Sequence, residues 1–137
     1  MSDSGSCLCG AVTFVANDVP EEVHACHCGM CRKWASGPVI AVRVASVEIT
    51  GSENITHFDS SDWAQRAFCS HCGSNLYFRL KDDDNYFLST GAFADPSKFR
   101  LSGEIYIDTK PEFYEFSGDH PRLTEEEFLA SFQPGED

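Results

Sequence analysis

The chain has 137 residues, of which 42% are hydrophobic and 23% are charged, and this is enough apolar material for one compact domain. Ten lysines and arginines stand against 22 aspartates and glutamates, so the formal net charge of −12 opposes binding to nucleic-acid phosphates or anionic membranes. The apolar runs are far shorter than the roughly 20 residues of a membrane span, and no secretory signal precedes them. We therefore expect one domain, residues 1–137, in a cytoplasmic protein that binds neither nucleic acid nor membrane.

Short runs rich in β-branched and aromatic residues recur between polar breaks and predict strands. In chain order these runs are residues 11–16, 39–44, 54–58, 75–80, 85–89, 104–108 and 112–116. Several alternate with period two, most clearly 112–116, which indicates antiparallel sheets with one buried face. The acidic triplet at 82–84 separates two runs and predicts a hairpin turn. The predicted fold class is mainly β.

One helix is predicted, near the C-terminus. Thr124 and Glu127 form a capping box, and three glutamates lie where the positive end of the helix dipole would be. Phe128, Leu129 and Phe132 form an apolar stripe, which we expect to pack against a sheet.

Cysteine is the most informative residue type in the chain. An odd number in tight local groups favours metal ligation over a disulfide framework. The seven are Cys7, Cys9, Cys26, Cys28, Cys31, Cys69 and Cys72. In extended backbone, residues i and i+2 point to the same side, while a two-residue gap is typical of a zinc knuckle. Glycines at 10, 29 and 73 lie beside these ligands, where the backbone must curl tightly.

Seven thiolates divide into four and three, which predicts two zinc ions per chain. A four-thiolate site is closed and structural, whereas three protein ligands leave a position for water or substrate. The contiguous set is Cys26, Cys28 and Cys31, and the remaining set is Cys7, Cys9, Cys69 and Cys72. A competing partition makes a zinc ribbon from Cys28, Cys31, Cys69 and Cys72. His27 and His71 lie inside the cysteine groups, and we expect them to hydrogen-bond or pack rather than ligate.

The segments that carry these cysteines resemble a known family. They read, in order, GSCLCGAVTF, CHCGMCRKWASGP and RAFCSHCGSNLYF. Over roughly residues 5–116 the chain is similar to the glutathione-dependent formaldehyde-activating enzymes, also called the centromere-protein-V type domain; residues 117–137 form an extension with the helix. The resemblance implies a β-tent of antiparallel sheets organised around two zinc sites. Cys7, Cys9, Cys69 and Cys72 would hold the structural zinc, and Cys26, Cys28 and Cys31 the catalytic zinc.

The resemblance also implies an activity, that of a zinc-dependent carbon–sulfur lyase similar to S-hydroxymethylglutathione synthase. It would join glutathione, or a similar thiol, to formaldehyde or another small aldehyde. Because glutathione is anionic, basic and aromatic residues are candidates for binding it: Arg32, Lys33, Trp34 and Arg66, with Arg43 a weaker one. Many family members have histidine where this chain has Glu104, which affects the expected substrate. The alternative function is a non-catalytic, zinc-stabilised scaffold that binds another protein; the sequence does not indicate an oligomeric state.

Overall fold

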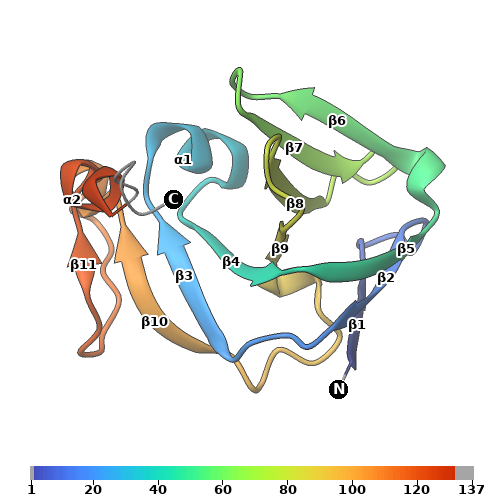
Figure 1. Ribbon diagram of the computed structural model, residues 1–137, viewed down its shortest axis with the longest axis horizontal. Helices are drawn as coiled ribbons and strands as arrows, with labels where there is room; N and C mark the ends of the chain where they lie inside the picture. Colours follow the sequence, from blue (N-terminus) through green and yellow to red (C-terminus); the bar gives the residue numbers. More distant parts are fainter. Residues whose placement is uncertain (1, 132–137) are drawn as a thin grey trace. The chain divides into compact units, whose positions relative to one another are not determined.

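The computed structural model describes residues 2–131, in which strands predominate and most strand pairs are antiparallel (Figure 1). The predicted mainly β class is therefore confirmed, whereas the β-tent and the single domain stay predictions. The residues group into two compact units, Met1–Val23 with Ala41–Arg100, and His24–Ile40 with Leu101–Asp137. The chain enters the second unit within β3 (Glu22–Cys26) and leaves it within β4 (Val39–Val44).

A three-stranded antiparallel sheet forms part of the first unit. Its order is β1-β2-β5, with bounds Ser2–Ser6, Thr13–Asn17 and Ser46–Thr50. Along β2, Phe14 and Ala16 are buried while Thr13 and Val15 are exposed, so one face of the sheet supplies the core.

A second antiparallel run of strands completes the first unit. Its order is β4-β9-β8-β7-β6, in which the last four have bounds Tyr86–Ser89, Asn75–Leu80, Ala64–Cys69 and Ile55–Asp59. Short 3-10 turns lie at Ser52–Asn54 (η1) and Thr90–Ala92 (η2). The predicted hairpin turn at 82–84 joins β8 and β9 and is confirmed.

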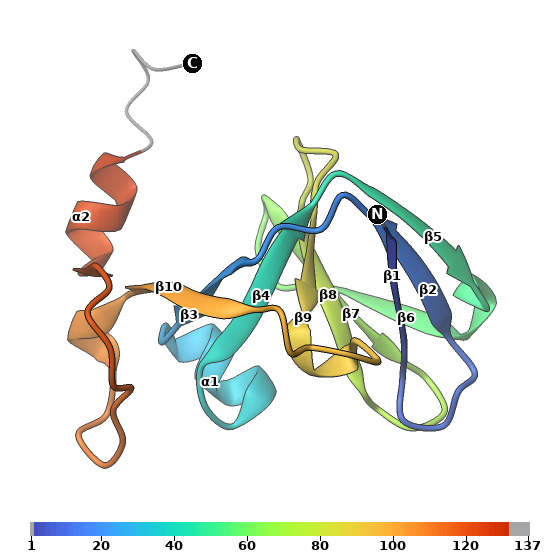
Figure 2. The same ribbon diagram turned by 90° about the horizontal axis from the view of Figure 1, so that it is seen from below.

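The core of the first unit lies between these two sheets, which oppose each other in Figure 2. Phe14 meets Phe93 edge to face with ring centroids 5.2 Å apart. Leu76 and Leu88 are almost fully buried on the other side. Full burial of such side chains contributes about 1.5–3 kcal/mol each, and this core fixes the loops that carry four of the cysteines.

The second unit contains the strand order β11-β10-β3 and both α-helices. β10 (Arg100–Ile105) and β11 (Arg122–Leu123) pair in parallel, with Glu104 opposite Arg122. The other elements are α1 (Gly29–Ala35), the 3-10 turn η3 (Ile107–Thr109) and α2 (Glu125–Ala130).

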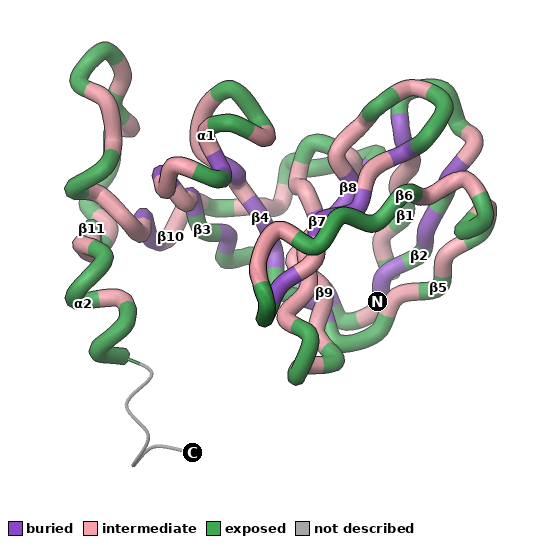
Figure 3. Tube along the Cα trace, turned by 90° about the horizontal axis from the view of Figure 1, so that it is seen from above, coloured by how far each residue is buried: buried purple, intermediate pink, exposed green. Residues whose placement is uncertain are grey.

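The helix α2 begins at the predicted capping box, with both reciprocal hydrogen bonds between Thr124 and Glu127 present. Its predicted apolar stripe does not pack as a whole. Leu129 is 51% exposed, and Phe128 contacts the ring of Tyr106, with centroids 5.8 Å apart. Most of α2 is exposed (Figure 3). Phe132 lies outside the described residues. Neither α-helix within residues 2–131 is long and apolar enough to cross a membrane.

The structure differs from the sequence-based expectation at three places in the second unit. Residues 112–116 form no strand, because the alternating Tyr114 and Phe116 pack on the ring of His27 instead of lining a sheet. The strand predicted at 104–108 begins earlier and ends at Ile105, where Tyr106 takes a left-handed conformation with φ of 59°. The helix α1 was not predicted, because its seven residues show no apolar stripe and its N-cap is a cysteine.

Candidate functional site

The first unit brings together the sulfur atoms of Cys7, Cys9, Cys69 and Cys72. The Cys9 Sγ atom lies 3.7 Å from Cys7 Sγ and 3.8 Å from Cys69 Sγ. Four sulfurs at about 2.3 Å from a zinc ion form a tetrahedron with edges of about 3.8 Å. The spacing and the donor chemistry therefore fit a tetrahedral metal ion with thiolate ligands.

Backbone turns around this cluster direct hydrogen-bond donors at the sulfurs. The amides of Val12 and His71 donate to Cys7 Sγ at 3.3 Å and to Cys69 Sγ at 3.4 Å. The glycines at 10 and 73 have φ of 81° and 78°, a conformation that L-residues with a side chain rarely adopt. The Ser74 hydroxyl lies 3.2 Å from Cys72 Sγ, and together with the backbone amides of Ser74 and Cys9 it lowers the pKa of Cys72 to about 5.

The second cluster, in the second unit, consists of Cys26, Cys28 and Cys31. Cys26 ends β3, and Cys28 is the N-cap of α1, where its sulfur accepts a hydrogen bond from the Cys31 amide at 3.4 Å. Cys31 is buried within the first turn of the helix. The strand end and the helix start thus direct three thiols to one point.

Hydrogen bonds between the thiols couple the ionisation of the three cysteines. Hydrogen bonds from Cys26 and then Cys31 lower the pKa of Cys28 to about 2. The same interactions raise the pKa of Cys26, because ionising a second thiol beside the first is unfavourable. A divalent cation removes this conflict by letting all three ionise together.

No fourth His, Cys, Asp or Glu side chain joins the second cluster in the part of the chain that the structure describes. The histidines beside the cysteines are engaged elsewhere, as expected from the sequence. The His71 ring donates to Asn54 Oδ1 at 2.9 Å, and the His27 ring binds Glu104 and Tyr114. The sulfur atoms thus gather as four and three, rather than as the competing ribbon.

Two of the predicted substrate-binding residues follow Cys31 directly in α1. Lys33 is exposed, and Arg32 is half-buried with its Nε atom buried and unbonded to any described residue. Trp34, in the same helix, is half-buried.

The remaining basic candidates belong to the first unit. Arg66 lies in β7, is 8% exposed and stacks its guanidinium over the Phe78 ring at 5.6 Å. Arg43 pairs with Asp83 at 3.2 Å. Their participation in substrate binding stays a prediction.

Several residues around the second cluster were missed by the sequence analysis. The Thr109 hydroxyl lies 3.1 Å from the carbonyl oxygen of His27 and 3.0 Å from that of Tyr106, so it can tie η3 to the cysteine loop. Burial raises the pKa of Tyr106, and the charges of Glu125 and of the three cysteines add to this effect. The left-handed residue at 106 therefore turns the chain beside the cluster, and no local sequence signal marks it.

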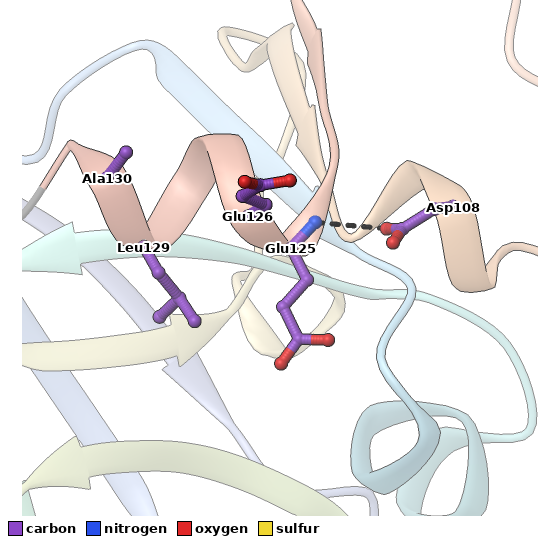
Figure 4. Close-up of a pocket in the computed structure, with 5 residues that line it drawn as sticks. All are labelled: Asp108, Glu125, Glu126, Leu129 and Ala130. Atoms are coloured by element: carbon purple, nitrogen blue, oxygen red, sulfur yellow. Dashed lines mark hydrogen bonds between the residues drawn. The ribbon is translucent and has the colours of Figure 1, made fainter.

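A shallow hollow of about 550 Å³ lies beside α2, lined by Asp108, Glu125, Glu126, Leu129 and Ala130 (Figure 4). The Asp108 carboxylate accepts a hydrogen bond from the Glu125 amide at 3.0 Å, which fixes the start of the helix. Three carboxylates repel an anionic ligand. This hollow is therefore unsuited to glutathione.

Comparison with known proteins places the chain in a family. The model of the glutathione-dependent formaldehyde-activating enzymes matches residues 2–109. An uncharacterised lyase of Schizosaccharomyces pombe is 32% identical over 129 residues, covering 93% of this chain and 94% of the yeast protein. A Halomonas elongata protein named for glutathione-dependent formaldehyde activation is 32% identical over 83 residues, 53% of each chain.

A crystal structure of a Rhodobacter sphaeroides protein has a similar fold, with a TM-score of 0.56 and 20% identity over 87% of this chain and 98% of that one. On the family match and the relative of nearly equal length, the chain belongs to the glutathione-dependent formaldehyde-activating enzyme family.

Proposed function

We propose that the protein is a zinc-dependent carbon–sulfur lyase that interconverts S-hydroxymethylglutathione with glutathione and formaldehyde. The observation that carries this proposal is the cluster of Cys26, Cys28 and Cys31, which offers three thiolates and no fourth ligand among the described residues. Membership of a family defined by glutathione and formaldehyde, and a relative named as a lyase, support it.

Each cysteine cluster would hold one zinc ion, the four-cysteine cluster a structural one and the three-cysteine cluster a catalytic one. A zinc ion bound by three thiolates would lower the pKa of an incoming thiol and supply a nucleophilic thiolate near neutral pH. The chain's own contribution is to present three sulfurs from a strand end and a capped helix, both fixed by backbone hydrogen bonds.

Arg32 and Lys33 would bind the carboxylates of glutathione. They follow Cys31 in α1, and the buried Arg32 Nε has an unused donor that an anion would satisfy. Trp34 and Arg66 are further candidates for lining the substrate site. The acidic surface, with a net charge of −12, does not favour nucleic acid as a partner.

The reaction itself needs no redox partner. The sulfur of glutathione forms a bond to the carbonyl carbon of formaldehyde, the carbonyl π bond breaks, and the thiol proton ends on the new hydroxyl oxygen. The reverse reaction breaks the carbon–sulfur bond and is the lyase direction. Another small thiol or aldehyde would react with the same bonds formed and broken.

Calorimetric titration of the zinc-loaded protein with glutathione tests the proposal. We expect binding accompanied by release of about one proton per glutathione, measured in two buffers of different ionisation enthalpy, because a metal-bound thiol loses its proton. Zinc-stripped protein should show neither effect. With carbon-13-labelled formaldehyde, the loaded protein should accelerate adduct formation beyond the uncatalysed rate.

S-methylglutathione is the matched control ligand, because it keeps the charges of glutathione and lacks the free thiol. It should bind weakly and release no proton. Equal binding of both ligands, or one buried zinc per chain with no response to thiols, would refute the proposal and favour the alternative of a zinc-stabilised scaffold.

A further inference from the structure

The second unit contains a buried carboxylate, Glu104. Its side chain is 1% exposed. Oε1 accepts from His27 Nε2 at 2.7 Å, while Oε2 lies 2.5 Å from His120 Nε2 and 3.1 Å from Arg122 Nε. We propose that Glu104 is a positioning residue of the three-cysteine site, acting through His27, and that the segment carrying His120 and Arg122 holds it there. This inference rests on the proposed metal at that site.

His27 connects Glu104 to the cysteines, because it stands between Cys26 and Cys28 in the chain. Its ring is fully buried. Besides Glu104, the ring binds the Tyr114 hydroxyl, with Nδ1 2.8 Å from the oxygen. Its backbone amide donates to the carbonyl oxygen of Ile105 at 3.1 Å. The backbone and the ring of this residue are therefore both tied to β10 and to the chain that leads from it to Tyr114.

Both nitrogens of the His27 ring have a hydrogen-bond partner. An ionised carboxylate can only accept, so Nε2 carries the hydrogen that is donated to Glu104. Nδ1 lies within hydrogen-bond distance of the Tyr114 hydroxyl. A ring held at both nitrogens has one orientation, and this orientation is set by Glu104 and Tyr114 together.

Because side chains alternate along extended backbone, anchoring the His27 ring also positions the sulfur atoms of Cys26 and Cys28. Neighbouring residues in extended backbone point to opposite sides, and Cys26 ends a strand while Cys28 is extended with φ of −65° and ψ of 161°. Fixing the His27 ring on one side therefore presents Cys26 and Cys28 on the other.

The groups around Glu104 favour its ionised form. Burial opposes ionisation, but hydrogen bonds from His120 and His27 outweigh it and lower the pKa of Glu104. The Glu104 amide also donates to the carbonyl oxygen of Pro121 at 3.0 Å, so backbone and side chain bind the same segment. Tyr114 lies beyond residues 2–109, the extent of the family match, and His120 and Arg122 lie in the extension, residues 117–137. The C-terminal extension thus holds Glu104, which in turn binds His27 in the loop of the three cysteines.

The test is the rate at which zinc passes from the two-zinc protein to a chromogenic chelator. Two phases of zinc release are expected, one from each cluster. The phase that is absent in the Cys28→Ser variant is the one from the three-cysteine cluster. Glu104→Gln, which keeps the size and removes the charge, should accelerate the three-cysteine phase about tenfold or more, as for other outer-shell partners. Tyr114→Phe should accelerate the same phase less, and both variants should alter the thiolate-to-cobalt absorption of cobalt-loaded protein. The four-cysteine phase should not change.

Two controls separate positioning from general destabilisation. Val44→Ala weakens the core of the first unit, and Glu22→Gln removes an exposed carboxylate paired with Arg100; neither should change the three-cysteine phase. The inference is overturned if Glu104→Gln releases zinc at the wild-type rate, or if it accelerates both phases equally. Should Glu104→Gln fail to fold, an unchanged phase in Tyr114→Phe overturns it. A wild-type protein with no three-cysteine phase refutes the proposed function itself.

Discussion

Both cysteine clusters offer thiolates as ligands for a metal ion, but they differ in how far apart these ligands lie in the sequence. Cys7 and Cys9 are about sixty residues from Cys69 and Cys72, so a metal ion there closes a long loop and restricts the unfolded chain. The three-cysteine cluster spans only six residues, so a metal ion there would close only a very short loop and would restrict the unfolded chain little. The sequence separation of the ligands therefore predicts that a metal ion in the four-cysteine cluster would maintain the fold, whereas one in the three-cysteine cluster would be free to take part in the reaction.

Removing one ligand from the four-cysteine cluster should have the largest effect. Structural zinc contributes roughly 10–16 kcal/mol in small metal-binding peptides, comparable to the roughly 5–15 kcal/mol stability of a whole domain. Cys69→Ser should therefore give insoluble or unfolded protein, measured by soluble yield and circular dichroism. Ser70→Ala, a change to the next residue in the same loop, should fold normally. A soluble Cys69→Ser protein with a native melting curve would contradict a structural role for this metal.

Removing a ligand from the three-cysteine cluster should spare the fold and abolish activity. In Cys28→Ser the serine hydroxyl replaces sulfur as the N-cap of α1, and serine is a favourable N-cap. The melting temperature should shift by only a few degrees, the zinc content should fall from two to one, and adduct formation should return to the uncatalysed rate. If thermal melts showed greater damage from Cys28→Ser than from Cys69→Ser, the roles of the two clusters would be reversed.

The two clusters also differ in how much of their surroundings the sequence could predict. Ligand spacing is a local property, so the pairs Cys7 with Cys9 and Cys69 with Cys72 could be recognised without a structure. Strands with strong β propensity were also predicted well: β4 and β8 have the predicted bounds. Strands β1, β3, β5 and β7 were missed. Serine and glycine dominate β1, β3 has only Val23 as a β-branched residue and β7 has none, whereas the β-branched residues of β5 were not recognised as a strand.

The surroundings of the three-cysteine cluster could not be predicted, because they come from distant residues. Glu104 and Tyr114 reach His27 across 77 and 87 positions of sequence, and no periodicity encodes such contacts. The alternation of polar and aromatic residues at 112–116 was interpreted as a strand, although it reflects packing on a single side chain. It places Tyr114 and Phe116 on one side, where they cover a ring rather than a sheet.

Arg32 offers a smaller test that concerns only the three-cysteine site. A hydrogen bond to a charged group is worth about 1.5–3 kcal/mol, so Arg32→Ala should raise KM for glutathione by about tenfold or more and leave the zinc content at two. Lys33→Ala, which removes an exposed cation, should have a smaller effect that disappears at high salt. A lower kcat with unchanged KM in Arg32→Ala would place the guanidinium elsewhere than on the substrate carboxylates.

The smallest expected effect concerns Ser74, which contacts the four-cysteine cluster alone. Its hydroxyl accepts from the Leu8 amide at 2.9 Å and lies 3.2 Å from Cys72 Sγ, so it links the two ligand loops. Because Ser74, together with the Cys9 amide, lowers the pKa of Cys72 to about 5, the thiolate's stabilising contribution is complete above the ordinary thiol pKa of about 8.5 and is lost as the pH falls through about 5.

Ser74→Ala should raise the pKa of Cys72, so protons displace zinc from this cluster at a pH higher by a few tenths of a unit. Zinc release followed during an acid titration measures the shift, and Ser70→Ala is the matched control because the Ser70 hydroxyl bonds Thr56 rather than a cysteine. Release from the three-cysteine cluster should keep its wild-type midpoint. An equal shift of both midpoints would mean that the two metals are lost together, and the separation of the clusters into a fold-maintaining and a working metal would fail.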